Sequence, residues 1–559
     1  MININNDTAK KDCCGCRACE QICPVKSISI ESDKEGFQYP EVDLKKCIDC
    51  GKCEKICPIR NKGDYYDVNA KDEPIAYGGW IKDEKTRYES SSGGVFSAFA
   101  NYILQNNGIV YGAVQDSDLS VKHIGIEKKE DLYRFRKSKY VQSDTQHSYT
   151  DIKKHLEKGR MVLFVGTPCQ VAGLHYFLQK PYKNLYLIDF ICHGVPSPKV
   201  FKSYIDFIEK KNNSKVSLFR FRTKDKGWNP LTQTGTYIEM DNGNIIRNYP
   251  AFRDEYMAGF LDDIYLRPSC YNCAFKSLPR YYSDITIADF WGIDRLDKEL
   301  YDGKGTSLLL INSEHGTELL NEVKDDVFLK KCDFKEAIKR NPSLIKSVEW
   351  NTRRDNFFKD FANKKFDYVA RKYMNPFIWC MHKVVKIIWG IVTRIIKTIL
   401  SPILKLLKIN WTDKNWDDFM QFVKFSMVGV TNVLVSYGIN VLTLLLLKNM
   451  NIRYDYVIAN TVAFVLSVLW SFCLNNKFVF KLSQNEERST IKTLIKTYIS
   501  YGFTGLILNN LLATFWIKVL GISKYISPLL NLPISIPINF LMNKLWAYKK
   551  NTGSEGECK

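Results

Sequence analysis

Short apolar runs alternate with amphipathic stretches between about residues 75 and 347. The runs are rich in β-branched residues and include MVLFVG (161–166), LYLIDFIC (185–192) and DITIADF (284–290). Runs of this length between helical stretches are typical of buried strands. The pattern predicts an α/β domain with a parallel or mixed sheet.

Beyond residue 418 the apolar runs become much longer. Four uncharged segments reach the length of about 20 residues that a bilayer-spanning helix needs; they cover 425–447, 456–476, 497–517 and 525–543. Lys and Arg are dense before the first segment, between the second and third, and after the fourth, and sparse in the other two loops. The positive-inside rule then predicts four transmembrane helices, with both termini on the cytoplasmic side of the inner membrane.

This membrane region contains an internal repeat. KFSMVGVT (424–431) resembles TYISYGFT (497–504), and NNKFVFK (475–481) resembles MNKLWAYK (542–549). We interpret the region as two parallel copies of a two-span hairpin. Prolines 528, 533 and 537 interrupt the fourth segment, and asparagines 509, 510 and 539 lie within spans. Such features indicate either a substrate path or hydrogen bonding between helices.

Residues 369–412 contain no Asp or Glu. At about 100° per residue, their basic side chains gather on about one third of a helix. The basic residues concerned are Lys383, Lys386, Arg394, Lys397, Lys405 and Lys408. We predict a basic amphipathic helix, bent near Pro402, that lies on anionic lipid; a buried helix of the soluble domain with a basic face is the alternative. Lipid explains much of the net charge of +20, so no nucleic-acid partner is expected.

The first 62 residues are rich in cysteine. They show no apolar segment of a cleaved signal peptide, so we expect the thiols to stay reduced inside the cell, where clustered cysteines more often bind metal. The run at 47–58 has the spacing C-x2-C-x2-C-x3-C-P, and the run DCCGCRACEQICP repeats it only from Cys13, which leaves Cys14 surplus. In this arrangement each run gives its fourth cysteine to the other cluster. The predicted sets are Cys13, Cys16, Cys19 with Cys57, and Cys47, Cys50, Cys53 with Cys23.

This region resembles two-cluster bacterial ferredoxins. The middle region resembles the coenzyme F-420 hydrogenase/dehydrogenase beta-subunit family over about residues 75–345. The resemblance rests on SSSGGVFSAFA (90–100), KSKYVQSD (137–144), FRFRTKDKGW (219–228), SDITIADFWGID (283–294) and the cysteine motifs GTPCQ, ICHG and CYNC. It implies an FAD beside an iron-sulfur cluster, and a third [4Fe-4S] cluster on Cys169, Cys192, Cys270 and Cys273. Two buried thiols with a zinc or redox pair are the alternative.

The same resemblance implies the flavin site and the chemistry around it. Its FAD contacts would be Ser92, Gly93, Gly94, Ser138, Lys139, Tyr140, Gln142 and Ser143. Lys139 would stabilise the anion of the reduced flavin. His193 would donate a proton to the product and Asp289 would orient flavin or substrate, although a His beside a cluster ligand more often supports that ligand and an Asp at a strand end is more often a cap.

The membrane region resembles GtrA-like proteins over about residues 418–550. That family is associated with moving polyprenyl-phosphate-linked sugars across membranes. The resemblance implies that a lipid phosphate meets a polar group at the cytoplasmic face, although the positive-inside rule alone would also place lysines there. The residues concerned are Asn475, Asn476, Lys477, Asn543 and Lys544.

Together these features predict a multidomain α+β and α protein. Its parts are a ferredoxin-like 2[4Fe-4S] domain (1–62), an α/β flavin and iron-sulfur domain (75–347), the basic helix (369–412) and a four-helix transmembrane domain (418–550), which we expect to dimerise. The predicted function is a membrane-anchored oxidoreductase that passes electrons from reduced ferredoxin or a similar donor, through [4Fe-4S] clusters and FAD, to an acceptor linked to surface polysaccharide or polyprenyl-phosphate-sugar metabolism. The alternative is a GtrA-like translocase of polyprenyl-linked sugars with an accessory redox domain.

Overall fold

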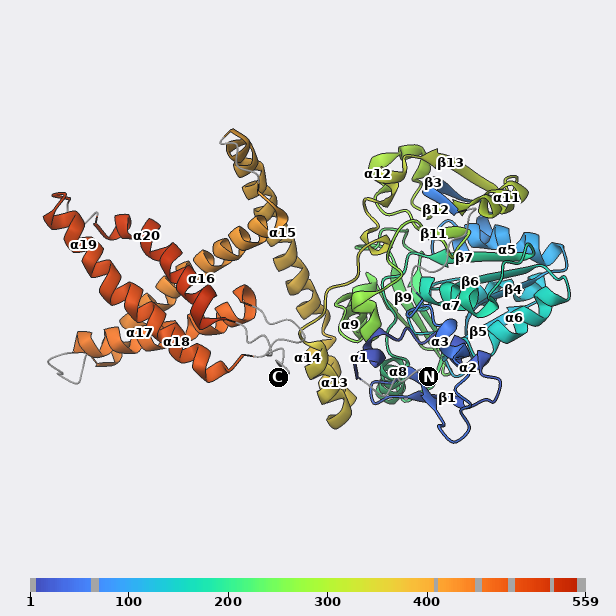
Figure 1. The fold of residues 1–559 in the computed structure, drawn as a ribbon, viewed down its shortest axis with the longest axis horizontal. Coiled ribbons are helices and arrows are strands. Elements are labelled where there is room, and N and C mark those ends of the chain that lie inside the picture. Colours follow the sequence, from blue (N-terminus) through green and yellow to red (C-terminus); the bar gives the residue numbers. More distant parts are fainter. Residues whose placement is uncertain are drawn as a thin grey trace. The chain divides into compact units, whose positions relative to one another are not determined.

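The computed structural model describes residues 7–61, 70–406, 411–447, 455–480, 488–522 and 527–549. The chain divides into two compact units, unit 1 (Met1–Val385) and unit 2 (Lys386–Lys559). Figure 1 shows both units, and each is described by itself.

Unit 1 is built on an eight-stranded mixed sheet with the strand order β13-β3-β12-β11-β7-β6-β4-β5. Strands β4, β6, β7 and β11 are parallel to one another, and the remaining strands add antiparallel edges on both sides. The strands are β3 (Ala70–Ile81), β4 (Ile109–Gln115), β5 (Val121–Ile126), β6 (Val162–Gly166), β7 (Leu185–Phe190), β11 (Ile285–Asp289), β12 (Ser307–Ser313) and β13 (Val327–Cys332). The predicted mixed sheet is confirmed, and the three apolar runs form neighbouring strands.

Helices cover both faces of this sheet (Figure 1). Because successive side chains of a strand point to opposite faces, Leu163 packs with α5 and α11, whereas Val162 and Phe164 pack with α6 and α7. The helices are α5 (Val95–Gln105), α6 (Ser148–Glu157), α7 (Pro168–Leu178) and α11 (Glu314–Glu322).

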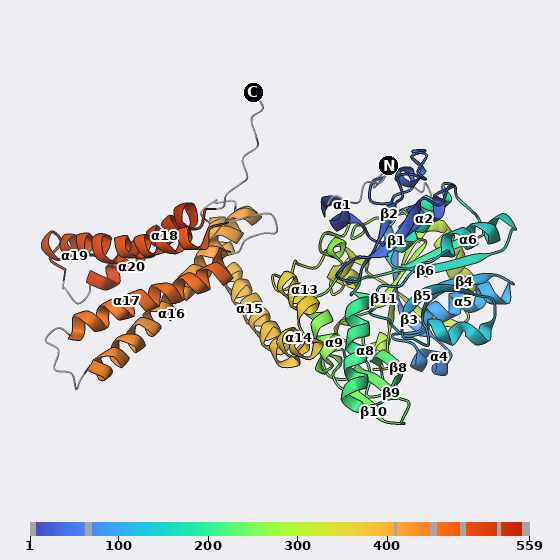
Figure 2. The same cartoon turned by 90° about the horizontal axis from the view of Figure 1, so that it is seen from below.

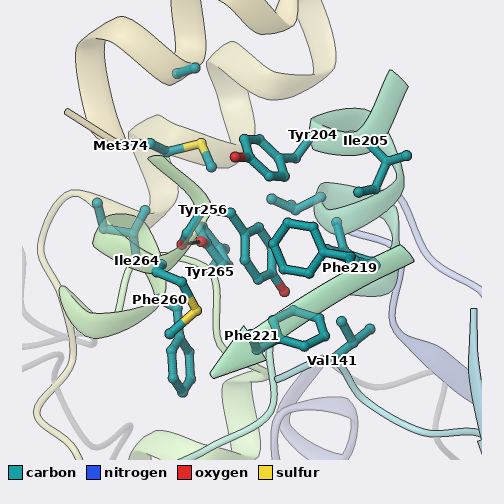
Figure 3. Packing of buried hydrophobic residues seen from close by; sticks show 14 of the residues in the cluster. Val141, Tyr204, Ile205, Phe219, Phe221, Tyr256, Phe260, Ile264, Tyr265 and Met374 are labelled. Atoms are coloured by element: carbon teal, nitrogen blue, oxygen red, sulfur yellow. Dashed lines mark hydrogen bonds between the residues drawn. The ribbon is translucent and has the colours of Figure 1, made fainter. Parts of the chain in front are cut away.

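A second core lies beside a three-stranded sheet of order β10-β9-β8. Figure 3 shows its packed aromatic rings, among them Tyr204, Phe219, Phe221, Tyr256 and Tyr265. The elements around it are α8 (Pro198–Asn212), β8 (Val216–Thr223), β9 (Gly235–Met240), β10 (Ile245–Asn248), α9 (Glu255–Leu261), α13 (Arg354–Asn363) and α14 (Phe366–Tyr373). Shorter helices connect these parts: α4 (Glu84–Glu89), η1 (Lys129–Phe135), η2 (Ala251–Arg253), η3 (Pro268–Asn272), α10 (Ile293–Leu296), η4 (Lys298–Leu300), α12 (Phe334–Ile338) and η5 (Pro342–Leu344).

The cysteine-rich N-terminal segment belongs to unit 1. It consists of α1 (Asp7–Asp12), α2 (Ala18–Ile22), the antiparallel strands β1 (Ile28–Ser32) and β2 (Gln38–Val42), and α3 (Lys52–Lys55). Gln21 Oε1 accepts hydrogen bonds from the backbone N–H groups of Tyr149 and Thr150, and the Thr145 hydroxyl donates to the Cys16 carbonyl. The segment is therefore fixed to the α/β domain by specific hydrogen bonds.

The basic helix is shorter than expected. It is one helix, α15 (Pro376–Leu406), which runs through Pro402 and across the division between the units. Residues 369–374 instead close the core of unit 1, where Val369, Ala370, Tyr373 and Met374 are buried. The break falls before Pro376 because a residue that precedes proline is disfavoured in helical conformation. Lys408 lies outside the described residues.

Unit 2 continues with α16 (Asp413–Leu447) and α17 (Asp455–Leu474), which lie side by side (Figure 2). The π-helix η6 (Asn475–Val479), α18 (Thr490–Gly502), the π-helix η7 (Phe503–Leu508), α19 (Asn509–Lys518), α20 (Ser527–Met542) and the π-helix η8 (Asn543–Ala547) follow. Among the described residues, Asn415–Leu447 and Val457–Val479 are long and apolar enough to cross a membrane. The third and fourth predicted spans stay predictions; the π-helix η7 divides the third one, and α20 covers residues 527–542 of the fourth.

The two halves of the sequence repeat end in the same way. Both matched segments form π-turns, in which the Phe480 N–H donates to the Asn475 carbonyl and the Tyr548 N–H to the Asn543 carbonyl, each at 2.8 Å. The rings of Phe480 and Tyr548 stack at 4.4 Å between centroids. Asn475 and Asn543 therefore occupy equivalent positions in the two halves of the repeat.

Candidate functional site

Unit 1 gathers its predicted cluster ligands around three cavities. The first cavity, of about 190 Å³, is lined by Cys13, Cys16, Cys19 and Cys57. The second cavity, of about 20 Å³, is lined by Cys23, Cys47, Cys50 and Cys53. The middle cavity, of about 190 Å³, is lined by Cys169, Cys192, Cys270 and Cys273. The structure thus places four of the twelve predicted cysteines at each cavity, and Cys14 also lines the first and middle cavities.

Each set encloses a space. In the described parts of the chain, no three Cys, His, Asp or Glu side chains converge as ligands of one metal ion. A donor set of four thiols around a space of this kind fits a polynuclear iron-sulfur cluster.

The two N-terminal cysteine runs share a backbone conformation. In each run the residues on either side of the second cysteine have positive φ, namely Gly15 (70°) and Arg17 (62°), then Asp49 (49°) and Gly51 (67°). These turns lead into α2 and α3, which carry Cys19 and Cys53. Because a ligand of the other set follows each short helix within two residues, α2 and α3 join the first and second cavities.

The middle cavity lies where two parallel strands end. Cys169 is in the first turn of α7, which follows β6, and Cys192 follows β7; ligands of open α/β sheets bind at this edge. Cys270 and Cys273 come from η3 and its C-cap. Burial raises the pKa of Cys270 to about 12 and also raises the pKa of Cys192. Because thiols bind metal as thiolates, a cluster here would displace these protons.

The first and middle cavities share a wall. Asp12, Cys14 and Ile59 line both. Cys14, which the spacing leaves without a cluster role, is buried in this wall. Two four-cysteine sites are therefore separated by a single layer of side chains.

His193 lines the middle cavity next to Cys192. Its Nε2 atom makes a short hydrogen bond with Asp263 Oδ1, and its carbonyl accepts a hydrogen bond from Lys276 Nζ at 3.1 Å. The side chain is about one third exposed (36%), so it can exchange a proton with solvent.

The carboxylate of Asp289, at the end of β11, forms an ion pair with Arg222. The guanidinium of Arg222 donates to both carboxylate oxygens, at 2.7 and 3.2 Å, and to the Ser91 carbonyl at 3.4 Å. The indole of Trp228 donates to the same carbonyl at 3.2 Å. Asp289 thus holds Arg222 against the loop at residues 91–94, called the Ser-Gly loop. Both carboxylate oxygens accept hydrogen bonds from Arg222.

The residues expected to contact FAD lie in separate places. Ser92, Gly93 and Gly94 form a loop that packs on β3 and β12, where a Cβ on Gly93 would lie 2.4 Å from the Gly79 carbonyl oxygen. The Ser138 N–H donates to Ser91 Oγ at 2.8 Å, which joins Ser138 to this loop. These four residues therefore lie together.

The other four expected FAD contacts are engaged elsewhere. Lys139 Nζ donates to four carbonyl oxygens of residues 134–137 at 3.0 to 3.3 Å, and burial lowers its pKa to about 7. Tyr140 stacks on Phe260, with 4.8 Å between ring centroids. Gln142 Nε2 donates to the Cys14 carbonyl at 3.4 Å, and Ser143 hydrogen-bonds His123. Gln142 therefore supports the N-terminal cysteine loop.

A cavity of about 350 Å³ adjoins the Ser-Gly loop. Its charged lining residues are Arg87, which pairs with Asp302, Lys304, which pairs with Glu84, and Lys224. Lys224 Nζ donates to the Ser92 carbonyl at 2.8 Å, and burial lowers its pKa to about 7. We did not predict these residues as a site. The signal was present in FRFRTKDKGW (219–228), which contributes Lys224.

In unit 2 some of the residues expected to meet a lipid phosphate are buried and others are exposed. Asn475 and Asn543 are fully buried, whereas Asn476 and Lys477 are exposed. Lys544 pairs with Asp418 at 2.8 Å. Asn476 Oδ1 accepts a hydrogen bond from the Arg488 guanidinium, and the buried pair is part of the helix packing.

Comparisons with protein families match three regions of the chain. Residues 76–147 and 159–337 match the models for the N-terminal and C-terminal parts of the coenzyme F420 hydrogenase/dehydrogenase beta subunit. Residues 12–61 match a 4Fe-4S dicluster domain, and residues 424–548 match the GtrA/DPMS transmembrane domain.

Comparison with solved structures finds a chain from the "F420-reducing [NiFe] hydrogenase complex from Methanosarcina barkeri". It has 16% sequence identity and a TM-score of 0.34, and the match covers 55% of this chain and 94% of that chain. No curated protein matches the chain.

Proposed function

We propose that this chain, which joins a 4Fe-4S dicluster domain, both parts of a coenzyme F420 hydrogenase/dehydrogenase beta subunit and a GtrA/DPMS transmembrane domain, is a membrane-anchored iron-sulfur flavoprotein oxidoreductase. The observation that carries the proposal is the wall of Asp12, Cys14 and Ile59 shared by the first and middle cavities. Redox centres held on both sides of one side-chain layer form a route for electrons.

Electrons would enter at the second cavity. Cys50 is exposed there, and the lysines around it favour an acidic donor such as reduced ferredoxin. The exposed lysines are Lys26, Lys45, Lys46, Lys52 and Lys55. Helices α2 and α3 connect this entrance to the first cavity, and the shared wall connects the first cavity to the middle one.

The bound [4Fe-4S] clusters would supply one-electron transfer, and the protein's residues would hold and insulate them. Cys14, buried between the first and middle cavities, would be the side chain that separates the two clusters. His193, hydrogen-bonded to Asp263, can hold a proton at Nε2 beside the middle cavity and return it to solvent.

FAD would bind at the Ser92–Gly94 loop and Ser138, beside the cavity that Arg87, Lys224 and Lys304 line together with Glu84 and Asp302. A flavin exchanges electrons singly or in pairs, so it would join the clusters to a two-electron acceptor. The membrane domain favours an acceptor in polyprenyl-phosphate-sugar or surface polysaccharide metabolism.

Anaerobic purification in detergent tests this proposal. We expect about twelve irons per chain, four for each of three clusters, with FAD in the extract and bleaching by a reduced low-potential donor. About eight irons would remove the middle cluster from the proposal. A preparation without flavin would remove the two-electron step.

A second candidate is a translocase of polyprenyl-linked sugars with an accessory redox domain, which the GtrA/DPMS match favours. The two functions differ in what they demand of the middle cavity. If envelope glycan depends on reduction, a chain with both Cys169→Ser and Cys192→Ser fails to complement a deletion strain. Undiminished glycan with this double variant would favour the translocase.

A further inference from the structure

Arg267 is a buried cation in contact with two sets of cysteines. Its side chain is fully buried, and among the described residues no carboxylate forms an ion pair with it. Its hydrogen bonds go to the carbonyls of Cys13 (2.7 Å) and Gln38 (2.9 Å) and to Gln142 Oε1 (3.0 Å). Burying a charge without a counter-ion is costly, so this guanidinium needs an anion that the polypeptide alone does not supply.

The guanidinium faces the sulfur of Cys13, which would be a thiolate when it holds a cluster. Arg267 Nη2 lies 3.7 Å from Cys13 Sγ, and Cys13 lines the first cavity. The rings of Tyr39 and Phe37 lie 4.3 and 5.5 Å from the guanidinium carbon and shield it from water. The charge therefore acts on the first cavity through a medium of low polarity, where electrostatic interactions are strong.

The same residue also belongs to the middle cavity. Arg267 lines that cavity, and its carbonyl accepts the Cys270 N–H at 2.9 Å. Its own N–H donates to the Val195 carbonyl at 2.9 Å, and the Val195 N–H in turn donates to Cys270 Sγ at 3.4 Å. Arg267 thus contacts the Cys13 thiol through its side chain and the Cys270 backbone through its carbonyl.

We propose that Arg267 is the shared counter-ion of the first and middle clusters and raises the reduction potential of the first one. A cluster with four thiolates gains negative charge when it is reduced, so a fixed buried cation beside Cys13 stabilises the reduced form. This proposal rests on the proposed function, because it needs clusters in both cavities.

The guanidinium group of Arg267 also joins the N-terminal segment to the α/β domain through hydrogen bonds. The experiment separates this structural role from the electrostatic one. Arg267→Gln removes the charge, and Arg267→Lys keeps it. Arg354 is the matched control. It is also buried and joins the same two parts through Glu35 and the Leu266 carbonyl, but it has a carboxylate partner and lines none of the three cysteine cavities.

Reduction of the purified full-length chain, followed by electron paramagnetic resonance at stepped potentials, gives the midpoint of each cluster. In Arg267→Gln we expect the first cluster's reduction equilibrium to fall at least tenfold, which is 59 mV for one electron, and we expect wild-type midpoints in Arg267→Lys and Arg354→Gln. Loss of the first cluster from Arg267→Gln alone would also support a counter-ion.

Unchanged midpoints in iron-loaded Arg267→Gln would overturn the proposal. Loss of the first cluster from both Arg267 variants, while Arg354→Gln retains it, would also overturn the proposal. The Arg267 side chain would then have only a structural role. A wild-type chain without clusters would instead contradict the proposed function, so the two failures are distinguishable by iron content.

Discussion

Cys13 and Cys14 are neighbouring thiols with different surroundings. Cys13 faces the first cavity alone, whereas Cys14 lies in the wall shared with the middle cavity. We predict that Cys13→Ser lowers iron from about twelve to about eight per chain and that Cys14→Ser keeps the full content. Iron analysis of the two variants beside the wild type checks this. Equal losses would mean that Cys14 is also a ligand.

Asp254 gives unit 1 a pH-dependent stability. It caps α9 through the Met257 N–H (3.0 Å), accepts the Tyr204 hydroxyl (2.7 Å) and is fully buried, and this burial raises its pKa to about 7. Since an unfolded Asp has a pKa near 3.9, the folded chain binds the extra proton between about pH 4 and pH 7. Stability from this group therefore falls as pH rises through that window.

Asp254→Asn keeps a capping side chain and removes the titration. We expect the variant to melt above the wild type at pH 8, and the difference to shrink toward pH 5. Thermal unfolding followed by near-ultraviolet circular dichroism at both pH values measures it. An equal difference at both pH values would contradict the prediction.

The sequence predicts some site residues better than others for a physical reason. The cysteine spacing is a local property, because each cluster ligand is placed by a turn and a short helix that the same few residues form. The contacts of Lys139 and Gln142 are not local. Lys139 faces the carbonyl end of η1, and Gln142 faces a loop more than a hundred residues earlier, so their roles depend on tertiary packing that a motif does not specify.

Among the elements, the strands were predictable and the end of unit 1 was not. The apolar runs of β6, β7 and β11 have no polar position facing solvent over most of their length, as buried parallel strands require. The absence of acidic residues after residue 369 suggested one continuous basic helix. That pattern could not reveal that α14 packs its apolar residues into the aromatic core before the chain breaks at Pro376.

Helix α14 should therefore be required for a stable unit 1. A chain that ends at Asn375 keeps Val369, Tyr373 and Met374 buried in the core, whereas a chain that ends at Lys364 loses them. Each large apolar side chain contributes about 1.5–3 kcal/mol when fully buried. We expect the longer chain to purify without detergent with its clusters, and the shorter one to aggregate. Equal solubility and iron content would contradict this role.

At the scale of the whole molecule, the question is how many times the chain crosses the membrane. The GtrA/DPMS match and two apolar helices support a membrane protein. The number of crossings depends on the second half of the repeat. There α18, η7 and α19 continue from residue 490 to 518, with Lys492 and Lys496 near the start and Lys518 at the end, and these lysines leave an uncharged stretch of about 20 residues, enough for a bilayer.

The loop at residue 523 lies on one side of the membrane if the chain crosses four times and on the other side if it crosses twice. A short epitope inserted after residue 523 of the full chain would face outward if the third and fourth segments span, because 497–517 then leads across the bilayer. With two spans the same epitope would face the cytoplasm. Insertions after residues 450 and 484 are matched controls, outside and inside in both cases. We predict antibody access in intact spheroplasts at 450 and 523, and at 484 only after permeabilisation. Access at 450 alone would leave the second half of the repeat at the cytoplasmic face and reduce the membrane domain to one hairpin anchor.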